Sequence, residues 1–517
     1  MVFKVVQKIK GNYYLYEAEG YWDPEAKKTK QIRKYIGKCD EKGNLIQEKT
    51  SQRTFSAGKT FGPYYLLLEL ASQSGLYDKL TKAHKEDADK LMALAIMRIV
   101  SPSSLRHIQT LMEESFLPEM LELDAEFFSS QNLSRFLKSI YENSKDRYSF
   151  LSSQISNDDV LIYDITGFDS LSKLNEYAEF GKNYQSTNMM QMNLGLVHSL
   201  DTDLPVYYKV FPGSIRDVST LSNLVSEVRE LGVGSSHFLI DRGFFSAFNL
   251  NGLTDCGIGF TIPGTYANKA VRNLVDECFD EIEDSDRRRM FKGKSIGIYE
   301  SAVKVGKYRY RSIAYYEKSR DSVSDDAFFG RLTDLEETYS GKNWDDELIK
   351  ELKGRKGLVS LLEFTSDKGR IKITRNKQLV DEYIKRHGIA ILLTTSNDSW
   401  DVVLSRYRHR NDAEEEFRML KSSMEGGVKY LSSRESVEGM LYIEFIALIL
   451  RTILLNRMRK ENMLQNIWIP DVISEMSKLK IGKIGNIWRL SELTKKQKEF
   501  LKKLGIDQPD SSDYELW

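Results

Sequence analysis

Cysteine is scarce in this 517-residue sequence, which contains only Cys39, Cys256 and Cys278. No two of them stand in a C-x-x-C spacing, so the pattern excludes a zinc ribbon and a disulfide framework. Three isolated thiols fit a reducing compartment, and we expect a cytoplasmic protein. The first residues also lack the apolar segment that marks a signal peptide.

Long hydrophobic runs are lacking as well. The longest apolar stretch, residues 440–455, is interrupted by Glu444 and Arg451. It is too short and too charged to cross a bilayer, so we predict a buried helix and no membrane partner.

The sequence has no excess of one charge, because 75 Lys and Arg balance 75 Asp and Glu. This balance excludes a bulk polycation but leaves DNA binding open, since DNA binding depends on where charge is concentrated. Both ends are basic, with 13 basic and 7 acidic residues from Met1 to Thr60, and 13 and 6 from Arg451 to Asp507. A solvated surface would also explain each basic end.

Several catalytic motifs are missing. The sequence has no G-x-x-x-x-G-K-[ST] loop, so NTP hydrolysis and a nucleotide cofactor have no support. No G-x-S-x-G or Cys/His arrangement stands out for covalent catalysis. Its carboxylates are the groups that remain to carry chemistry.

The patterns of apolar and charged residues differ along the chain and divide it into regions. Hydrophobic residues make up 41% and charged residues 29%, as in a globular protein with several structural units. Alternating apolar runs predict strands, and a 3.6-residue period predicts helices. We predict six regions. The first three are basic strands with an antiparallel hairpin at 1–60, helices at 61–150 and a strand-dense block at 151–262. The last three are a strand-rich insertion at 263–387, a region at 388–460 that begins with an apolar strand like those of 151–262, and a basic helical tail at 461–517.

The segment SRYRHRNDAEEEFRMLKSSM carries a clear functional signal. It contains no Gly or Pro and is predicted to be helical. Four of its side chains can bind phosphate or metal: Tyr407, Arg410, Glu414 and Lys421. At about 100° per residue all four fall within roughly 60° of arc, whereas the neighbouring Glu415 and Glu416 point elsewhere. This face suggests a metal site beside a nucleic-acid backbone; an ordinary solvated face with helical ion pairs is the alternative.

Two aspartates stand in strand-like surroundings. Asp164 lies in the apolar run V-L-I-Y-D-I-T, where a buried carboxylate must be neutralised, paired or bound to a cation. Asp241 ends the strand H-F-L-I-D, and ligand sites gather at the carboxyl ends of strands in open α/β sheets. Each could instead be structural, as a strand-end carboxyl or a helix cap. Asp158, Asp159 and Asp169 lie nearby in loop-like sequence, and we expect them to be solvated.

These acids together predict a metal site. Two strand-borne Asp and one helix-borne Glu supply hard oxygen ligands, which suit Mg²⁺ or Mn²⁺ better than zinc. Two such ions can activate a water and stabilise the leaving oxygen of an in-line phosphoryl transfer. We therefore predict a two-ion catalytic site formed by Asp164, Asp241 and Glu414.

The same residues lie in motifs that resemble a known family. The motifs are YDIT around Asp164, PGSIRDVSTL around Asp217, LIDRGFFS around Asp241, and Y-x2-R-x3-E-x6-K from Tyr407 to Lys421. They resemble the DDE transposases of prokaryotic insertion sequences. The complete YREK spacing resembles, more narrowly, the insertion-sequence-four family. The resemblance is strongest over residues 155–262 and 388–460.

The resemblance implies an α/β fold. Its catalytic core would be a ribonuclease H-like mixed sheet with flanking helices, interrupted by a strand-rich insertion. An N-terminal strand-then-helix region would precede this core, and a helical C-terminal tail would follow it. The spacing agrees, because Asp164 and Asp241 are 77 positions apart whereas Asp241 and Glu414 are 173 apart, which leaves room for the insertion.

The resemblance also implies roles for the site residues. Asp164 would contact both divalent ions, and Asp241 and Glu414 would complete one ion site each. DNA phosphates near the cleaved end would be held by Tyr407, by Arg410 through a bidentate fork, and by Lys421 as a point charge. Asp217 would be structural.

The implied activity is DNA transposition. A metal-activated water would cut the element's ends, and the freed 3′-hydroxyl would attack target DNA. The expected partners are double-stranded DNA, at the ends and at the target, and further copies of the chain in a dimer or larger synaptic complex at the nucleoid. The region 1–60 is a candidate for end recognition. Two alternatives stay open: a metal-dependent nuclease without strand transfer, and a non-catalytic DNA-binding protein derived from a transposase.

Overall fold

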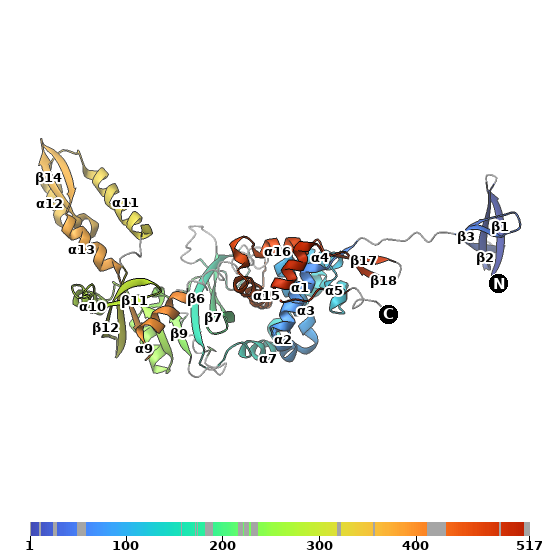
Figure 1. Cartoon of the computed structure of the whole chain (residues 1–517), viewed down its shortest axis with the longest axis horizontal. Helices are drawn as coiled ribbons and strands as arrows, with labels where there is room; N and C mark the ends of the chain where they lie inside the picture. Colours follow the sequence, from blue (N-terminus) through green and yellow to red (C-terminus); the bar gives the residue numbers. More distant parts are fainter. Residues whose placement is uncertain are drawn as a thin grey trace.

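The chain contains several structural parts, which Figure 1 shows in sequence colours. The computed structural model describes residues 2–9, 12–23, 28–48, 58–156, 158–170, 172, 174–180, 190–215, 221, 227–228, 236–317, 322–354, 357–410, 431–484 and 487–510. The described strands form sheets of four, nine, two and three strands, so the fold is mixed α/β with one large sheet.

The N-terminal part is a four-stranded antiparallel sheet in the order β1-β2-β3-β4. Its strands are β1 (Val2–Ile9), β2 (Asn12–Asp23), β3 (Lys28–Cys39) and β4 (Leu45–Glu48). β2 pairs with β3 from Tyr13 opposite Cys39 to Asp23 opposite Lys28, which confirms the hairpin predicted from alternating residues around a turn.

A helical body follows in the chain. Its N-terminal elements are β5 (Lys59–Thr60), α1 (Gly62–Gln73), α2 (Leu76–His84), α3 (Ala88–Val100), α4 (Leu105–Glu114), α5 (Leu117–Met120), α6 (Ser130–Glu142) and α7 (Ser144–Ser152). Its C-terminal elements are α15 (Arg434–Lys460), α16 (Ile469–Met476), β17 (Lys480–Ile484), β18 (Ile487–Leu490) and α17 (Lys495–Lys503). The sheet β18-β17-β5 joins the two halves, although they are separated by most of the sequence.

The centre of this body is α15, the helix predicted to be buried. It packs against α1, α3 and α6 and against β8 of the large sheet, so nearly every side of the helix is covered. Covering from all sides explains its apolar sequence without amphipathic periodicity. A Cβ at Gly439 would lie 2.2 Å from the Leu137 carbonyl oxygen, so only glycine permits this approach to α6. No helix among the described residues has the length and hydropathy to cross a bilayer.

The large sheet has the order β11-β12-β13-β16-β10-β9-β6-β7-β8. Its strands are β6 (Val160–Asp169), β7 (Gln191–Ser199), β8 (Leu204–Pro212), β9 (His237–Ile240), β10 (Gly259–Pro263), β11 (Arg288–Phe291), β12 (Lys294–Val305), β13 (Tyr308–Tyr316) and β16 (Ile389–Thr394). β9 is parallel to both β6 and β10, and the other neighbours are antiparallel. The connecting helices include α9 (Ala247–Asp255) and α10 (Lys269–Cys278).

A smaller unit interrupts the large sheet between β13 and β16. It contains α11 (Ser322–Tyr339), α12 (Asp346–Gly354), the hairpin β14 (Leu362–Asp367) and β15 (Arg370–Arg375), and α13 (Lys377–Gly388). These elements share a hydrophobic core of their own. Figure 1 shows the unit projecting from one end of the sheet.

The first helix of this unit begins at Ser322, whereas the insertion predicted from the sequence (263–387) begins at residue 263. Strands β11 to β13, which fall within that range, are hydrogen-bonded into the large sheet, and β13 pairs with β16 over six residues. The pattern of residues could not predict that these strands belong to the large sheet. A strand at the edge of one sheet has the same alternation of apolar and polar residues as a strand of a separate sheet. The division of the chain into six domains stays a prediction.

Candidate active site at the junction of two parallel strands

Asp164 and Asp241 lie on neighbouring strands at the same level of the sheet. β6 and β9 pair in parallel, with Ile162 opposite Leu239 and Tyr163 opposite Ile240. Extending this register by one residue places Asp164 opposite Asp241. Asp241 keeps extended backbone angles (φ −75°, ψ 156°) as it precedes the short 3-10 helix Arg242–Phe244. Neighbouring strands are about 4.8 Å apart, and matched positions face the same side, so the sheet brings the two carboxylates together.

The surroundings of the two aspartates differ from those of the nearby acids. Asp164 is half-buried and accepts a hydrogen bond from the Ile165 amide over 2.8 Å. Asp241 keeps 42% of its side-chain surface exposed. Asp158 is exposed, as expected, but Asp159 is buried. The expectation for Asp159 was wrong because its carboxylate is used structurally, accepting from the Ser156 amide over 3.0 Å.

Tyr407 and Arg410 meet Asp241 from the helix over residues 400–410. Arg410 Nη1 donates to Asp241 Oδ1 over 2.9 Å, and the guanidinium carbon lies 5.5 Å from the centre of the Tyr407 ring. Burial raises the pKa of Tyr407, and Asp241 raises it further while Arg410 opposes this, so the phenol stays protonated at neutral pH. The predicted stripe therefore holds for these two residues, one helical turn apart.

The other two residues of the stripe, Glu414 and Lys421, lie outside the described residues, as does Asp217. Within the described part of the chain, no three His, Cys, Asp or Glu side chains form a group able to hold a metal ion. The assignment of Glu414 as the third carboxylate stays a prediction.

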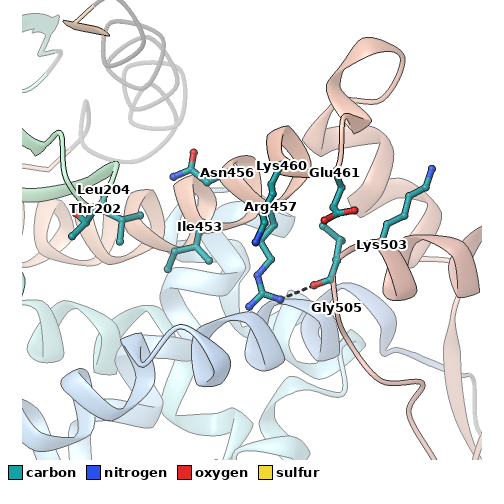
Figure 2. A pocket seen from close by; sticks show the side chains of 10 residues that line it. Thr202, Leu204, Ile453, Asn456, Arg457, Lys460, Glu461, Lys503 and Gly505 are labelled. Carbon is teal, nitrogen blue, oxygen red and sulfur yellow. Dashed lines mark hydrogen bonds between the residues drawn. The ribbon is translucent and has the colours of Figure 1, made fainter. Parts of the chain in front are cut away.

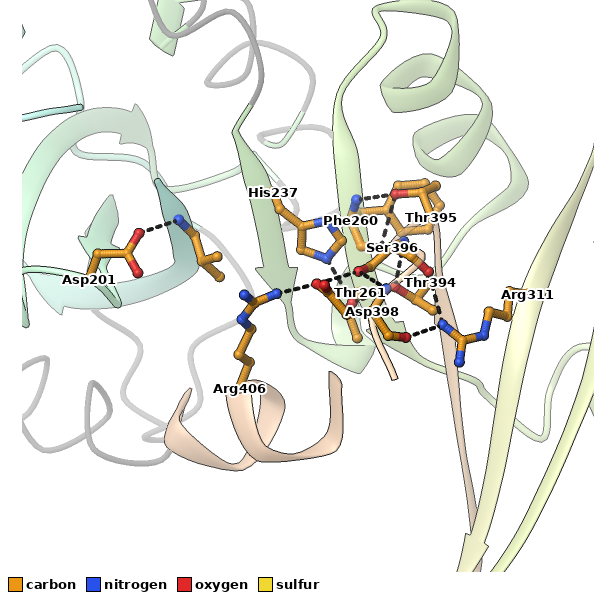
Figure 3. Close-up of polar contacts among 11 residues, drawn as sticks. Asp201, His237, Phe260, Thr261, Arg311, Thr394, Thr395, Ser396, Asp398 and Arg406 are labelled. Carbon is orange, nitrogen blue, oxygen red and sulfur yellow. Dashed lines mark hydrogen bonds and ion pairs between the residues drawn. The ribbon is translucent and has the colours of Figure 1, made fainter. Parts of the chain in front are cut away.

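A polar cluster anchors the start of the same helix (Figure 3). Arg406 Nη1 donates to Asp398 Oδ2 over 2.5 Å, and Arg311 donates to the backbone carbonyl of Ser396 over 3.1 Å. His237 on β9 lies beside them, with Nε2 2.8 Å from Thr261 Oγ1. Burial and the charge of Arg406 lower the pKa of His237 to about 4, while Asp398 opposes this, so the imidazole is neutral. The arginine contacts join β13 and the helix to the loop that precedes the helix, and the His237 contact joins β9 to β10.

A comparison with known protein families assigns this part of the chain. A family model described as "Transposase DDE domain" covers residues 156–450, more than half of the chain. The chain belongs to this family. The transposase domain so defined begins just before β6 and ends within α15, and it contains Asp164, Asp241, Tyr407 and Arg410.

Similarity to individual proteins is weaker. No curated protein matches the chain. Among solved structures, the chain resembles a piggyBac transposase in a synaptic complex with hairpin DNA, determined by cryo-electron microscopy. The two share 9% identity and a TM-score of 0.36, over 86% of this chain and 78% of the other. A score this low does not establish a shared fold.

A second ion-pair group, not foreseen from the sequence, fixes the transposase domain's helix on its other side. Arg408 donates to Glu317 Oε2 over 2.9 Å, and Lys294 donates to Oε1 of the same carboxylate over 2.8 Å. The Arg408 guanidinium also lies 4.9 Å from the centre of the Phe291 ring. Glu317 is only 4% exposed and directly follows β13. The spacing of Arg406, Arg408 and Arg410 was the available signal, because a helix turns Arg408 to the face opposite Arg406 and Arg410.

The chemistry of the two aspartates fits a divalent cation. Asp164 lies on β6 and Asp241 directly follows β9, and hard oxygen donors suit Mg²⁺ or Mn²⁺. The Arg410 guanidinium already occupies one oxygen of Asp241, which shows that the position attracts positive charge. Asp164 and Asp241 could hold a metal, with a third ligand still to be supplied.

Proposed function

We propose that the transposase cuts the ends of an insertion sequence and joins them to target DNA by two-metal phosphoryl transfer. The observation that supports this most is the parallel register of β6 and β9, which makes Asp164 and Asp241 neighbours. The strand order β8-β7-β6-β9-β10, antiparallel across β8, β7 and β6 and parallel across β6, β9 and β10, supports a ribonuclease H-like core. The complete YREK spacing favours the insertion-sequence-four family.

Asp164, Asp241 and Glu414 would hold two Mg²⁺ or Mn²⁺ ions. When bound, such a pair supplies an activated water and stabilises the leaving oxygen. The described side chains contribute positioning. Arg410 can exchange its bond to Asp241 for a bidentate grip on a phosphate, because both partners are anions of similar geometry. The protonated Tyr407 phenol can donate a hydrogen bond to a phosphate oxygen. Lys421 would add a third phosphate contact.

The DNA partners would be the element's ends and the target, bound by a dimer or larger synaptic complex at the nucleoid. The N-terminal sheet is our candidate for end recognition, since β3 carries Lys38 and Arg33, and Arg33 is exposed. Removal of residues 1–60 should abolish sequence-specific end binding and leave metal binding intact. Specific binding by the shortened protein would rule this role out.

An assay with labelled ends, a target plasmid and Mg²⁺ tests the proposed reaction. Joined molecules would support transposition. Cleaved ends without joining would indicate a nuclease, and retarded but intact DNA would indicate a non-catalytic binder. These products separate the three activities that the sequence left open.

Variants in the same assay test the site. Asp164→Asn and Asp241→Asn should each lower cleavage by about a thousandfold or more, because neutral amides bind hard cations poorly. End binding should persist. Asp158→Asn is the matched control: it is exposed near the same strand, and its left-handed backbone (φ 72°) tolerates Asn. Equal loss in all three variants would contradict the assignment.

Substitution of Glu414 and of the two adjacent glutamates tests which of them is the third metal ligand. Glu414→Ala should eliminate cleavage, whereas Glu415→Ala and Glu416→Ala should retain most of it, since the helix turns them about 100° and 200° away. If Glu416→Ala proved as damaging as Glu414→Ala, the stripe would be assigned to the wrong acid.

A further inference from the structure

The helix α17 (Lys495–Lys503) presents an exposed face rich in lysine. Its buried side consists of Gln497, Phe500 and Leu501, which dock the helix on the body. Thr494 and Gln497 form a capping box, so the first turn is well fixed. Five of its nine residues are exposed lysines: Lys495, Lys496, Lys498, Lys502 and Lys503.

Three of these lysines form one stripe. Lys495, Lys498 and Lys502 are spaced three and four residues apart, which puts them within roughly 60° of arc along about 10 Å of helix. The stripe lines a surface hollow of about 670 Å³, together with Glu499 and Asp507. The exposed side of α17 carries no large apolar residue. A charged stripe without apolar residues suits a polyanion better than a lipid surface.

A second hollow, of about 470 Å³, adjoins the first at Gly505 (Figure 2). Its charged lining residues are the cations Arg457 and Lys460, at the end of α15, and Lys503, together with one acid, Glu461. Arg457 is part of the wall, because its Nη1 donates to the Leu504 carbonyl over 2.6 Å and to Gln73 Oε1 over 2.8 Å. In Figure 2, Lys503 extends outward from this wall. The two hollows thus form one basic groove on a rigid support.

Most of these cations are not neutralised by the protein. Glu499 pairs with Lys503 over 2.9 Å. In contrast, no carboxylate of the described residues forms an ion pair with Lys460, Lys495, Lys498 or Lys502. The arginines of the 400–410 helix behave differently, since Arg406, Arg408 and Arg410 each have a carboxylate partner. Unpaired cations lining a groove are available to an external anion.

We propose that this groove, which we call the α17 groove, binds the phosphate backbone of double-stranded DNA without reading its sequence. It is lined by Arg457, Lys460, Lys495, Lys498, Lys502 and Lys503. Lysine ammoniums act as mobile point charges and contact phosphates without specifying bases. A stripe about 10 Å long matches a few successive phosphates, which are about 3.4 Å apart along the axis of each strand. The proposal rests on the proposed function, because it assumes a DNA substrate.

The test measures binding of the full chain to a duplex of arbitrary sequence, by fluorescence anisotropy at several salt concentrations and without divalent ions. In the parent, log K should fall linearly with log salt concentration. The variant Lys495→Gln/Lys498→Gln/Lys502→Gln should reduce this slope by about 0.9 per lost phosphate contact, hence by about 2 to 3. At low salt it should bind at least about tenfold more weakly.

A matched variant controls for net charge. Lys82→Gln/Lys138→Gln/Lys145→Gln removes three exposed lysines from α2, α6 and α7 and should leave the slope unchanged. The thermal unfolding of both variants should match that of the parent, because every substituted side chain is exposed. An unchanged slope in the α17 variant, or an equal decrease in both variants, would overturn the proposal.

This outcome is separable from that of the proposed function. Asp164→Asn should keep the parent's slope, because the measurement needs no cleavage. A decreased slope in the α17 variant of a protein that cleaves nothing would support the groove and reject the enzyme. Normal end joining by an α17 variant with the parent's slope would reject the groove alone. A parent that binds no duplex would reject both.

Discussion

Arg410 and Asp241 form an ion pair, in which Nη1 donates to Oδ1 over 2.9 Å at the carboxyl end of β9. The pair places a permanent cation where a divalent ion is expected to bind. Arg410 is 12% exposed and Asp241 is 42% exposed, so the carboxylate remains open to solvent on one side.

Removal of this guanidinium should have opposite effects on metal and on DNA. Arg410→Ala should bind Mn²⁺ several-fold more tightly in the absence of DNA, because a competing cation is lost. It should also slow end cleavage by about 10- to 100-fold, because a charged hydrogen bond to phosphate is lost. Paramagnetic resonance of free Mn²⁺ and single-turnover cleavage measure the two effects. Arg406→Ala removes the same charge from the pair with Asp398 and should leave Mn²⁺ affinity unchanged; an equal gain there would contradict the model of competition.

Glu317 should contribute to stability through its two cations. Glu317→Gln should lower the free energy of unfolding by about 1–3 kcal/mol, since it weakens charged hydrogen bonds to Arg408 and Lys294. Lys294→Ala should cost less than about 1 kcal/mol, because this lysine is 59% exposed and the Arg408 bond remains. Chemical denaturation measures both.

The pH dependence of this contribution has a definite sign. Burial favours the neutral acid of Glu317, but hydrogen bonds from Lys294 and Arg408 outweigh it, so the pKa is lowered below 4.5. A lowered folded-state pKa means that the stabilisation is present above pH 4.5 and is lost as the pH falls through the lower, folded value. Glu317→Gln should therefore differ from the parent most at neutral pH and least in acid. A constant difference would show that the charge is not responsible.

His237 should make the protein less stable as the solution becomes mildly acidic. Burial lowers its pKa from 6.5 to about 4, so between these values the unfolded chain takes up a proton that the folded chain does not. The free energy of unfolding should therefore fall as the pH decreases from 7 to 5. His237→Gln can keep a hydrogen bond to Thr261 but cannot be protonated, so its decrease over the same range should be smaller. Parallel curves for the two proteins would be the contrary result.

The buried pair of Arg98 and Glu444 should be costly to break and cheaper to replace. Arg98 Nε donates to Glu444 Oε1 over 2.6 Å, and both side chains are 1% exposed. Glu444→Leu should destabilise by about 3–5 kcal/mol, because it leaves a buried guanidinium without its carboxylate. The double variant Arg98→Met/Glu444→Leu should lose less than Glu444→Leu alone. Thermal and chemical unfolding of both variants give the comparison, and a double variant less stable than the single one would disagree.

Local sequence determined several features of this protein. Alternation around a turn was enough for the β2–β3 hairpin, and a continuous apolar segment was enough for the buried helix α15. Residue spacing placed Tyr407 and Arg410 on one helical face, since i and i+3 are neighbours on any helix. The resemblance to DDE transposases rests on the same kind of local pattern, and the family match over residues 156–450 supports that broader assignment.

Only the tertiary structure decided which distant residues meet. Asp164 and Asp241 are neighbours because β6 and β9 pair in parallel, and a separation of 77 positions leaves no local signal of that register. The same holds for Glu317, whose partners Lys294 and Arg408 come from a strand and a helix far apart in the chain. Strands β11 to β13 could not be assigned to the large sheet for this reason either. Periodicity reports the face on which a side chain lies, whereas strand pairing and ion pairing depend on which elements pack together, and packing is a property of the whole chain.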